Sequence, residues 1–149
     1  MVKITQYVHY GSDTFEPARV TESVYCYPGK PPYGLWGCRQ GGKYDWRSFC
    51  LGKRMLEAQL LTQFTFHLTP EARVLEIFRP DDVEAYMTQE WTETCRSRQL
   101  DFPRLKAAYD GMELMDFRAW QRNPFLHFLL PGWDCESICV WNPEVIVAE

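Results

Sequence analysis

Strand-like and helix-like segments follow one another along this sequence without a regular β-α-β alternation. Residues 4–11 alternate in polarity and are rich in β-branched and aromatic side chains, a pattern that predicts a strand. Residues 45–61 instead have apolar side chains at helical spacing. Because further strand-like runs separate and follow the helical ones, the sequence predicts an α+β fold.

The remaining elements are predicted from local pattern and turn residues. Further strands are expected at 18–27, 34–38, 63–78 on both sides of a Thr-Pro-Glu turn, 110–117 and 136–149, where Asn-Pro separates two segments. Further helices are expected at 80–98 and 101–109, and 118–130 has helical spacing interrupted by Asn-Pro. No internal repeat or linker divides the 149 residues, so we expect a single domain spanning 1–149.

Apolar runs and cysteine spacing indicate the class of protein. No run approaches the roughly 18 apolar residues of a membrane span, and the N-terminus lacks the apolar core of a signal peptide. We therefore expect a soluble cytoplasmic protein without a membrane partner. The six cysteines include no C-x-x-C pair and do not cluster with the three histidines, so we expect buried or free thiols and no metal site.

The charge of the chain is negative overall but unevenly distributed. A net charge of −4 argues against a general nucleic-acid binder, because neutralisation of phosphates supplies that affinity. Residues 1–75 carry nine basic and six acidic side chains, or +3, whereas the remainder carries seven basic and fourteen acidic side chains, or −7. Arg39, Lys43 and Arg47 belong to the basic excess, and a local anion site is compatible with an acidic whole.

The segment 30–50 combines glycines, basic residues and large aromatic rings. It holds four glycines, four basic side chains, two tryptophans and two tyrosines. Aromatic side chains are usually buried, and glycine-rich loops usually carry small polar residues. The segment is either a binding site, where flat rings and close backbone approach are both useful, or a turn folded over the edge of the core.

Four motifs occur in a set order on predicted strands. They are VHYGSDTF at 8–15, YGLWGC at 33–38, FTFHLTPEARVLEI at 64–77, and YDGMEL at 109–114 followed by ESICVWNPEVI at 136–146. Together they resemble the ADP-ribosyltransferase superfamily, in its histidine–aromatic–glutamate branch of diphtheria toxin and the poly(ADP-ribose) polymerases. The resemblance implies a split, mixed or antiparallel β-sheet core with flanking helices. Two positions depart from the family pattern, since Tyr10 separates His9 from Gly11 and Trp36 replaces the usual tyrosine.

The resemblance implies NAD as the co-substrate, with no metal. The residues that it assigns to the NAD site are His9, Gly11, Ser12, Tyr33, Gly34, Trp36 and Glu136. Cleavage of the nicotinamide–ribose bond passes through an oxocarbenium-like transition state, so the site must hold the ring and stabilise a developing cation. By resemblance, His9 binds the adenine-side ribose, and Gly11 and Ser12 hold the nicotinamide amide. Trp36 stacks on the ring, and Glu136 binds the ribose 2′-hydroxyl and stabilises the cation.

Several alternatives remain at this point. Glu113, on the predicted strand at 110–117, is a second candidate for the catalytic acid. Arg39, Lys43 and Arg47 fit the pyrophosphate of NAD, a solvated surface or, as we expect, an acidic target.

Two functions are compatible with the resemblance. One is transfer of ADP-ribose from NAD to an intracellular macromolecule, a protein in preference to a nucleic acid, as in a toxin, a phage host-takeover factor or an antagonist of defence systems. The other is a catalytically silent binding module that blocks a partner through the same aromatic cleft.

Overall fold

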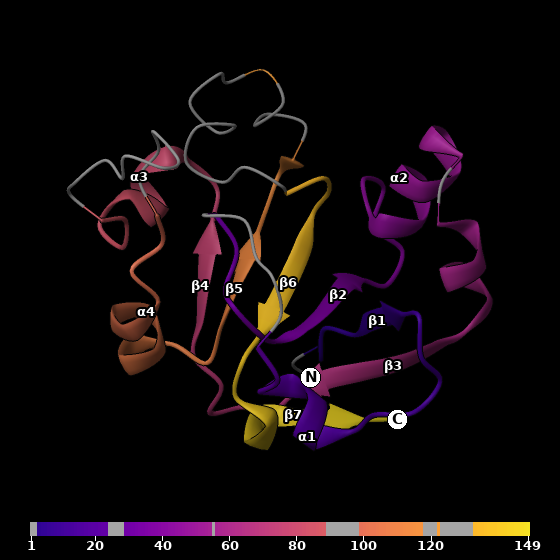
Figure 1. The fold of residues 1–149 in the computed structure, drawn as a ribbon, viewed down its shortest axis with the longest axis horizontal. Helices are drawn as coiled ribbons and strands as arrows, with labels where there is room; N and C mark the ends of the chain where they lie inside the picture. The colour runs from indigo at the N-terminus through magenta and orange to yellow at the C-terminus, as the bar shows by residue number, and fades with distance from the viewer. Residues whose placement is uncertain (1–2, 24–28, 55, 89–98, 118–121, 123–132) are drawn as a thin grey trace.

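One seven-stranded mixed sheet forms the centre of the protein (Figure 1). The computed structural model describes residues 3–23, 29–54, 56–88, 99–117, 122 and 133–149. The strands are β1 (Tyr7–Tyr10), β2 (Leu35–Arg39), β3 (Gln63–Leu68), β4 (Val74–Ile77), β5 (Gly111–Leu114), β6 (Ser137–Val140) and β7 (Ile146–Ala148). Their order is β4-β5-β6-β2-β1-β3-β7, with β4 parallel to β5 and the other neighbours antiparallel. The predicted α+β class is confirmed.

The sheet changes direction where β2 meets β1. The ladder between these two strands consists of the pairs Tyr7–Arg39 and Val8–Cys38. In Figure 1, β4, β5 and β6 run almost vertically, β1, β3 and β7 run almost horizontally, and β2 crosses between the two groups. The two halves therefore diverge while remaining one continuous sheet, so the structure has a single sheet where the resemblance implies a split one.

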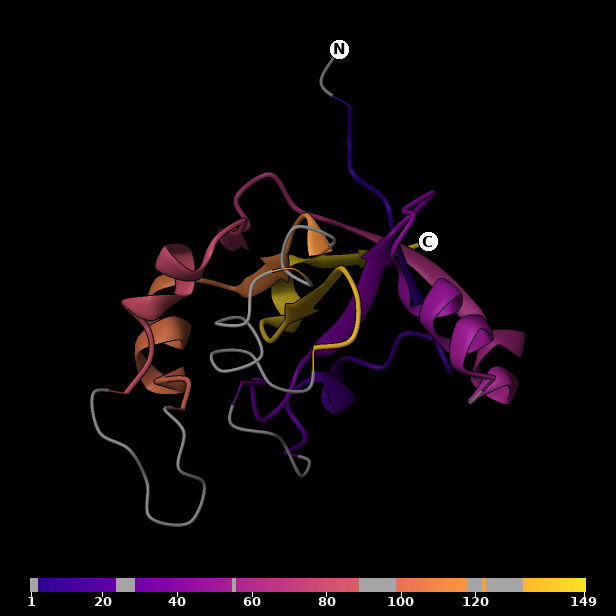
Figure 2. The same ribbon diagram turned by 90° about the horizontal axis from the view of Figure 1, so that it is seen from above.

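Short helices lie around the sheet. They are α1 (Pro17–Val20), α2 (Trp46–Lys53), α3 (Pro80–Glu84) and α4 (Phe102–Ala108), with the 3-10 helices η1 (Glu57–Leu61) and η2 (Pro143–Val145). Figure 2 shows α3 and α4 together at one end and α2 at the other. The Asp45 side chain caps α2 by accepting a hydrogen bond from the backbone of Ser48 at 2.9 Å. None of the described helices has the length and apolar character needed to cross a bilayer.

Two hydrophobic cores lie on opposite faces of the sheet. Side chains alternate between faces along a strand, so Met112 and Leu114 of β5 enter one core while Ile138 and Val140 of β6 enter the other. Strands covered on both faces have continuous apolar sequences, and every residue of β5 and β6 is buried. The core around Met112 also contains Trp133, so it borders the segment that the next section examines.

Three sequence predictions differ from the observed elements. Within the predicted strand at 18–27, the described part begins as α1, because Pro17 fixes a helical φ at the first turn and Arg19 pairs with Glu16 at 2.9 Å. The predicted helix at 45–61 is divided into α2 and η1, with the left-handed residues Arg54 and Leu56 between them. Strand β1 begins at Tyr7, three residues later than expected.

The strands predicted within 63–78 are present but are not neighbours. Strand β3 pairs with β1 and β7, whereas β4 lies at the opposite edge of the sheet beside β5. The helix predicted at 80–98 is represented by α3, and 89–98 lies outside the described residues. The segment 118–130, for which helical spacing was noted, also lies outside them except for Arg122.

Candidate functional site

A cavity of about 220 Å³ lies beside β1, β2 and the segment that leads into β6. Its walls are Val8, His9, Tyr10, Lys30, Trp36, Gly37, Cys38, Trp46, Gln59, Trp133, Asp134, Cys135 and Ser137, and we call it the aromatic cavity. Three indole rings contribute to it, from β2, α2 and the segment before β6. Its volume is below the ~300–1,000 Å³ typical of sites that enclose a drug-sized ligand, so it suits a single ring with its substituents.

The aromatic segment at 30–50 builds one side of this cavity. Trp36 of β2 is half-buried and meets the ring of Trp133 edge-on, with centroids 4.8 Å apart and an interplanar angle of 64°. The chain then turns through Gly41, which has a φ of 80°, and returns as α2, whose first residue is Trp46. The glycines let the backbone reverse direction, and the reversal places Trp36 and Trp46 in the same wall.

His9 is fixed by a backbone contact between β1 and β2. Its Nδ1 lies 2.7 Å from the carbonyl oxygen of Trp36. Because a carbonyl oxygen only accepts, the imidazole must donate from Nδ1, which leaves Nε2 of the neutral ring as an acceptor. Burial lowers the pKa of His9, so the ring is neutral at physiological pH. His9 can therefore accept a hydrogen bond from a ligand hydroxyl.

A second cavity, of about 150 Å³, shares His9 with the aromatic cavity. Ser12 and Gly34 also line it, together with residues of α1 and β3. The Ser12 hydroxyl donates to the carbonyl of Thr14 at 2.7 Å and so closes a local turn. Gly11 is exposed at the end of β1 with a φ of 105°, a conformation that favours glycine. Ser12 and Gly34 therefore line the second cavity, Trp36 lines the aromatic cavity, and His9 lies between the two cavities.

Gly34 and Tyr33 contribute to strand packing. A Cβ on Gly34 would collide with the Cys139 sulfur, so glycine permits the close approach of β2 to β6. The Tyr33 ring packs edge-on against Phe102, with centroids 5.2 Å apart, and joins the core around Met112. The structure therefore places Tyr33 in core packing and does not include it in the wall of either cavity.

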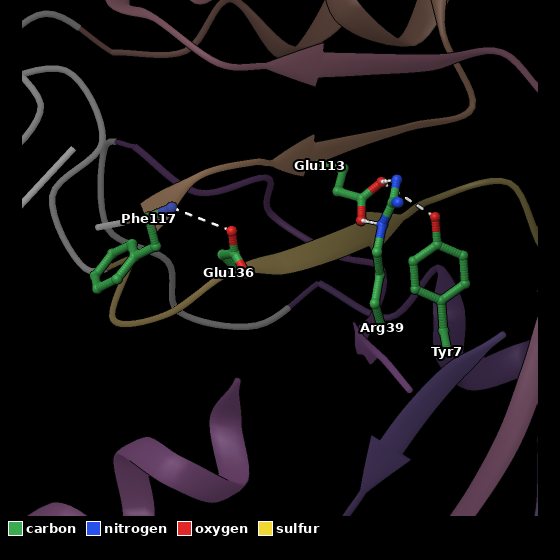
Figure 3. Close-up of polar contacts among 5 residues, drawn as sticks. All are labelled: Tyr7, Arg39, Glu113, Phe117 and Glu136. Atoms are coloured by element: carbon green, nitrogen blue, oxygen red, sulfur yellow. Dashed lines mark hydrogen bonds and ion pairs between the residues drawn. The ribbon is translucent and has the colours of Figure 1, made fainter. Parts of the chain in front are cut away.

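Glu136 lies just before β6 but faces away from the aromatic cavity. Its chain neighbours Cys135 and Ser137 line that cavity, and strand alternation directs Glu136 to the opposite face. There its carboxylate accepts a hydrogen bond from the backbone N–H of Phe117 at 3.2 Å (Figure 3). It lines a cavity of about 30 Å³, roughly sufficient for one or two waters, together with Glu113.

Glu113, the alternative acid, is held in a buried polar cluster. The carboxylate accepts hydrogen bonds from Arg39 Nε at 2.8 Å, from Arg39 Nη2 at 3.0 Å and from the Tyr7 hydroxyl at 3.1 Å. Figure 3 shows these contacts beside Glu136. Glu113 is only 3% exposed, so water cannot solvate its charge. Arg39 compensates that charge within the protein. Burial and the adjacent carboxylate raise the pKa of Tyr7, which therefore stays a hydrogen-bond donor.

The three predicted target-binding cations have different surroundings. Arg39 is committed to Glu113, although 41% of its side chain remains accessible. Lys43 and Arg47 are exposed in the turn before α2 and in its first turn, and Arg47 follows Trp46 of the aromatic cavity. Arg47 also acts electrostatically on Tyr10, another residue of the cavity wall. Lys43 and Arg47 are consequently the two members of the set that present their charge to solvent.

No family model, curated protein or solved structure matches this chain. The arrangement of residues at the site therefore has to carry any functional proposal.

The described cysteines are free and lie in the interior. Cys38, Cys50, Cys135 and Cys139 are free and buried, as expected, whereas Cys26 and Cys95 lie outside the described residues. Hydrogen bonding with Cys38, together with burial, raises the pKa of Cys135, and burial raises that of Cys139. Within the described ranges, no three His, Cys, Asp or Glu side chains are grouped so that they could hold a metal ion.

Among the residues of the aromatic cavity that sequence reasoning did not assign to the site, three bring an indole ring or a positive charge. Trp46 and Trp133 supply two of the three indoles, and Lys30 places its ammonium nitrogen 5.3 Å from the centroid of the Trp36 ring. The cap residue Asp45 was a usable signal for Trp46, because it fixes the start of α2 and hence which ring returns toward β2. Trp133 reaches the cavity from a distant part of the chain, and no local pattern indicates that contact.

Proposed function

We propose that this protein binds NAD with the nicotinamide ring in the aromatic cavity and transfers ADP-ribose to an intracellular macromolecule. One observation carries the proposal. Strands β1, β2 and β6, which bear three of the motifs that resemble ADP-ribosyltransferases, lie side by side. His9 and Trp36 both line one indole-lined cavity, and His9 Nδ1 donates to the backbone carbonyl of Trp36. A planar aromatic ring is the group that such a cavity accommodates best.

The reaction moves positive charge from the ring to the sugar. In NAD the nicotinamide is a pyridinium, and when the bond from its N1 to ribose C1′ breaks, the electron pair stays on the nitrogen and the ring leaves neutral. The ribose becomes an oxocarbenium ion, which the acceptor's nucleophile captures at C1′ before it releases its proton to solvent. The protein must hold the ring, orient the ribose and stabilise the transient cation.

The available contacts support distinct roles for two of these residues. Nε2 of His9 is free to accept a hydrogen bond from a ribose hydroxyl, since Nδ1 is committed to Trp36. Of the two acids, Glu136 is the one that the resemblance assigns to the cation, and this role requires its side chain to turn from the Phe117 N–H toward the aromatic cavity. Arg39 already compensates the charge of Glu113, whereas the described residues provide Glu136 with a backbone N–H and no cation within 4 Å.

The decisive experiment is release of nicotinamide from NAD by three purified variants. Glu136→Gln should lower kcat by about 10²–10³-fold, because the charge is needed chiefly in the transition state. The exposed Glu144→Gln is the matched control and should retain full activity. Folded Glu113→Gln should stay within about tenfold of wild type. Near-wild-type turnover by Glu136→Gln together with an inactive, folded Glu113→Gln would reverse the assignment.

The acceptor is proposed to be a protein, because the chain is acidic overall and phosphate-rich nucleic acid would be repelled. Incubation of a cell lysate with tagged NAD and the protein, followed by protease or nuclease treatment, tests this choice. Loss of the label with protease alone supports a protein acceptor, whereas loss with RNase or DNase contradicts it.

The orientation of Glu136 favours a second candidate function. Its carboxylate lies outside the wall of the aromatic cavity and is bound by Phe117, an arrangement that suits a silent module that binds a partner through that cavity. Wild-type protein that neither binds NAD nor releases nicotinamide, with or without lysate, would favour this second function.

A further inference from the structure

Two cysteines lie next to each other in the wall of the aromatic cavity. Cys38 is in β2 and Cys135 is in the segment that leads into β6, and both line the cavity. The β2–β6 ladder pairs Gly37 with Ile138. Continuation of that register sets Cys38 opposite Ser137, so Cys135, two residues earlier, lies on the same face of the sheet as Cys38. The two thiols are therefore diagonal neighbours across the strands.

The surroundings of the two sulfurs differ. The Cys38 sulfur accepts a hydrogen bond from the backbone N–H of Trp46, the first residue of α2, at 3.3 Å. Cys135 also hydrogen-bonds with Cys38, and this contact, together with burial, raises the pKa of Cys135. Cys135 therefore keeps its proton and is the donor of the pair, whereas Cys38 is the sulfur that accepts from both neighbours.

The cavity gives the pair a shared route to solvent. Cys38 and Cys135 are only 3% and 5% exposed, and both line the cavity of about 220 Å³. A molecule as small as hydrogen peroxide can enter a space of that size. The other two described thiols, Cys50 and Cys139, are 0% exposed and do not line the cavity. A small oxidant that enters the cavity therefore meets Cys38 and Cys135 before it meets either of these.

We propose that Cys38 and Cys135 form an oxidisable dithiol that a small hydroperoxide converts to a disulfide. The Cys38 sulfur attacks one peroxide oxygen, the O–O bond breaks, and the thiol proton leaves with the second oxygen as water. The Cys135 sulfur then attacks the sulfur of the Cys38 sulfenic acid, the S–O bond breaks, and the Cys135 proton leaves with that oxygen as a second water.

The reaction oxidises the two thiols by two electrons and reduces one peroxide to two waters. It involves neither NAD nor an acceptor, so it is independent of the proposed function. The bond would connect β2, which carries Trp36, to the segment that carries Trp133, and so fix two indole-bearing walls of the cavity relative to each other.

Mass spectrometry after treatment with hydrogen peroxide tests the pair directly. The parent protein for the test carries Cys26→Ser and Cys95→Ser, which leaves the four described cysteines. Its mass should fall by two hydrogen atoms, and peptide mapping without reduction should join the peptide of Cys38 to that of Cys135. Dithiothreitol should separate the two peptides. Because the bond closes a long loop, oxidation should also raise the midpoint of thermal unfolding by several degrees.

Single substitutions test the role of each sulfur. Cys135→Ala should leave Cys38 as a sulfenic acid that dimedone labels, whereas Cys38→Ala should leave Cys135 unlabelled. Cys139→Ala is the matched control, because Cys139 is a buried thiol whose S–H donates to the carbonyl of Tyr33 at 3.7 Å. This control should form the Cys38–Cys135 link at the rate of the parent protein. Thermal melts verify that each variant is folded, and the peptide map of the parent protein does not depend on the variants.

The outcomes decide for or against the dithiol. A Cys38–Cys135 link in the folded parent protein supports it. Four intact thiols after peroxide treatment, or sulfinic acid on Cys38 beside a free Cys135, would overturn it. A link from Cys38 to Cys50 would also overturn it, and Cys50 is the nearest rival because Cys38 is among the groups that raise its pKa.

Discussion

At the scale of single residues, the hydrogen bond between His9 and the Trp36 carbonyl connects strand pairing to the proposed recognition of NAD. The same contact that closes the space between β1 and β2 selects the tautomer of His9 and leaves Nε2 as an acceptor. Protonation of Nε2 would remove that acceptor, and burial opposes protonation by lowering the pKa. Recognition of a ribose hydroxyl by His9 should therefore persist across the physiological pH range.

His9 should also make folding stability depend on pH. An unfolded histidine takes up a proton near pH 6.5, whereas the folded state resists protonation until a lower pH. Between those two values the unfolded state binds more protons, so the free energy of unfolding falls as pH decreases below about 6.5, by at most ~1.4 kcal/mol per pH unit. Chemical denaturation of wild type and His9→Gln from pH 5 to 8 gives the free energy of unfolding of each protein. The variant should lack the part of the pH dependence that His9 contributes. Identical pH slopes for the two proteins would contradict the assignment.

At the scale of elements, the cluster of Tyr7, Arg39 and Glu113 connects strands from both halves of the sheet. Tyr7 is in β1, Arg39 is in β2, and Glu113 is in β5, two strands beyond β2. Because the β1–β2 ladder has only two residue pairs, these side-chain contacts supplement a short backbone connection. We therefore expect the cluster to help fix the angle between the two halves.

The two charged members of this cluster should differ in their effect on stability. Arg39→Met leaves the Glu113 carboxylate buried without a cation, which should lower the free energy of unfolding by about 3 kcal/mol. Glu113→Gln leaves a part-exposed guanidinium that water can solvate, so it should cost less, about 1–2 kcal/mol. The double variant should cost less than the sum of the two. Denaturant titrations of wild type, the two single variants and the double variant complete a double-mutant cycle. Strict additivity of the losses in the free energy of unfolding would show that Arg39 and Glu113 are not coupled.

The sequence predicted most of the strands because their patterns are local. Alternation and flanking turn residues identify β1, β2, β3, β5 and β6, whereas the order of strands depends on pairings between distant residues. For this reason the two strands predicted within 63–78, which are adjacent in the sequence, gave no sign that β4 lies at one edge of the sheet and β3 near the other. Likewise, Pro17 outweighed the β-branched residues that follow it.

The candidate site could be predicted only in part. The resemblance named His9 and Trp36, and both residues line one cavity, although the strand register directs their side chains to opposite faces of the sheet. It could not give the face on which Glu136 lies, because that depends on the register of β6 against β2, which places Cys139 opposite Trp36. A shift of one residue would exchange Glu136 with its neighbours, so identity and spacing alone do not determine the direction of this side chain.

At the scale of the whole molecule, the distribution of charge favours one end for macromolecular contacts. Lys43 and Arg47 are exposed on either side of Trp46, the α2 residue of the aromatic cavity, in a chain that is acidic overall. An acidic acceptor would be steered toward this end by long-range attraction, while like charge on the rest of the surface would disfavour other orientations.

Replacement of Lys43 and Arg47 by glutamine should separate acceptor docking from NAD binding. Hydrolysis of NAD without acceptor should be unchanged, whereas transfer to the acceptor should fall and become less sensitive to salt than in wild type, since exposed charges are screened within about 10 Å at 0.1 M. Arg104→Gln with Lys106→Gln, at the far end of the sheet, is the matched control. Measurement of NAD hydrolysis and of transfer to the acceptor at two salt concentrations distinguishes acceptor docking from NAD binding. Equal loss in both would assign the two cations to NAD instead.

The gathering of indoles around the aromatic cavity also gives the protein an optical property. Three of its six tryptophans, Trp36, Trp46 and Trp133, lie in the cavity wall, whereas Trp141 is buried and donates its indole N–H to Tyr109 at 2.8 Å. A pyridinium ring in contact with indole accepts an excited electron and quenches its emission. Occupancy of the cavity should thus dim the intrinsic fluorescence of the unlabelled protein, with the light from Trp141 remaining as a constant background.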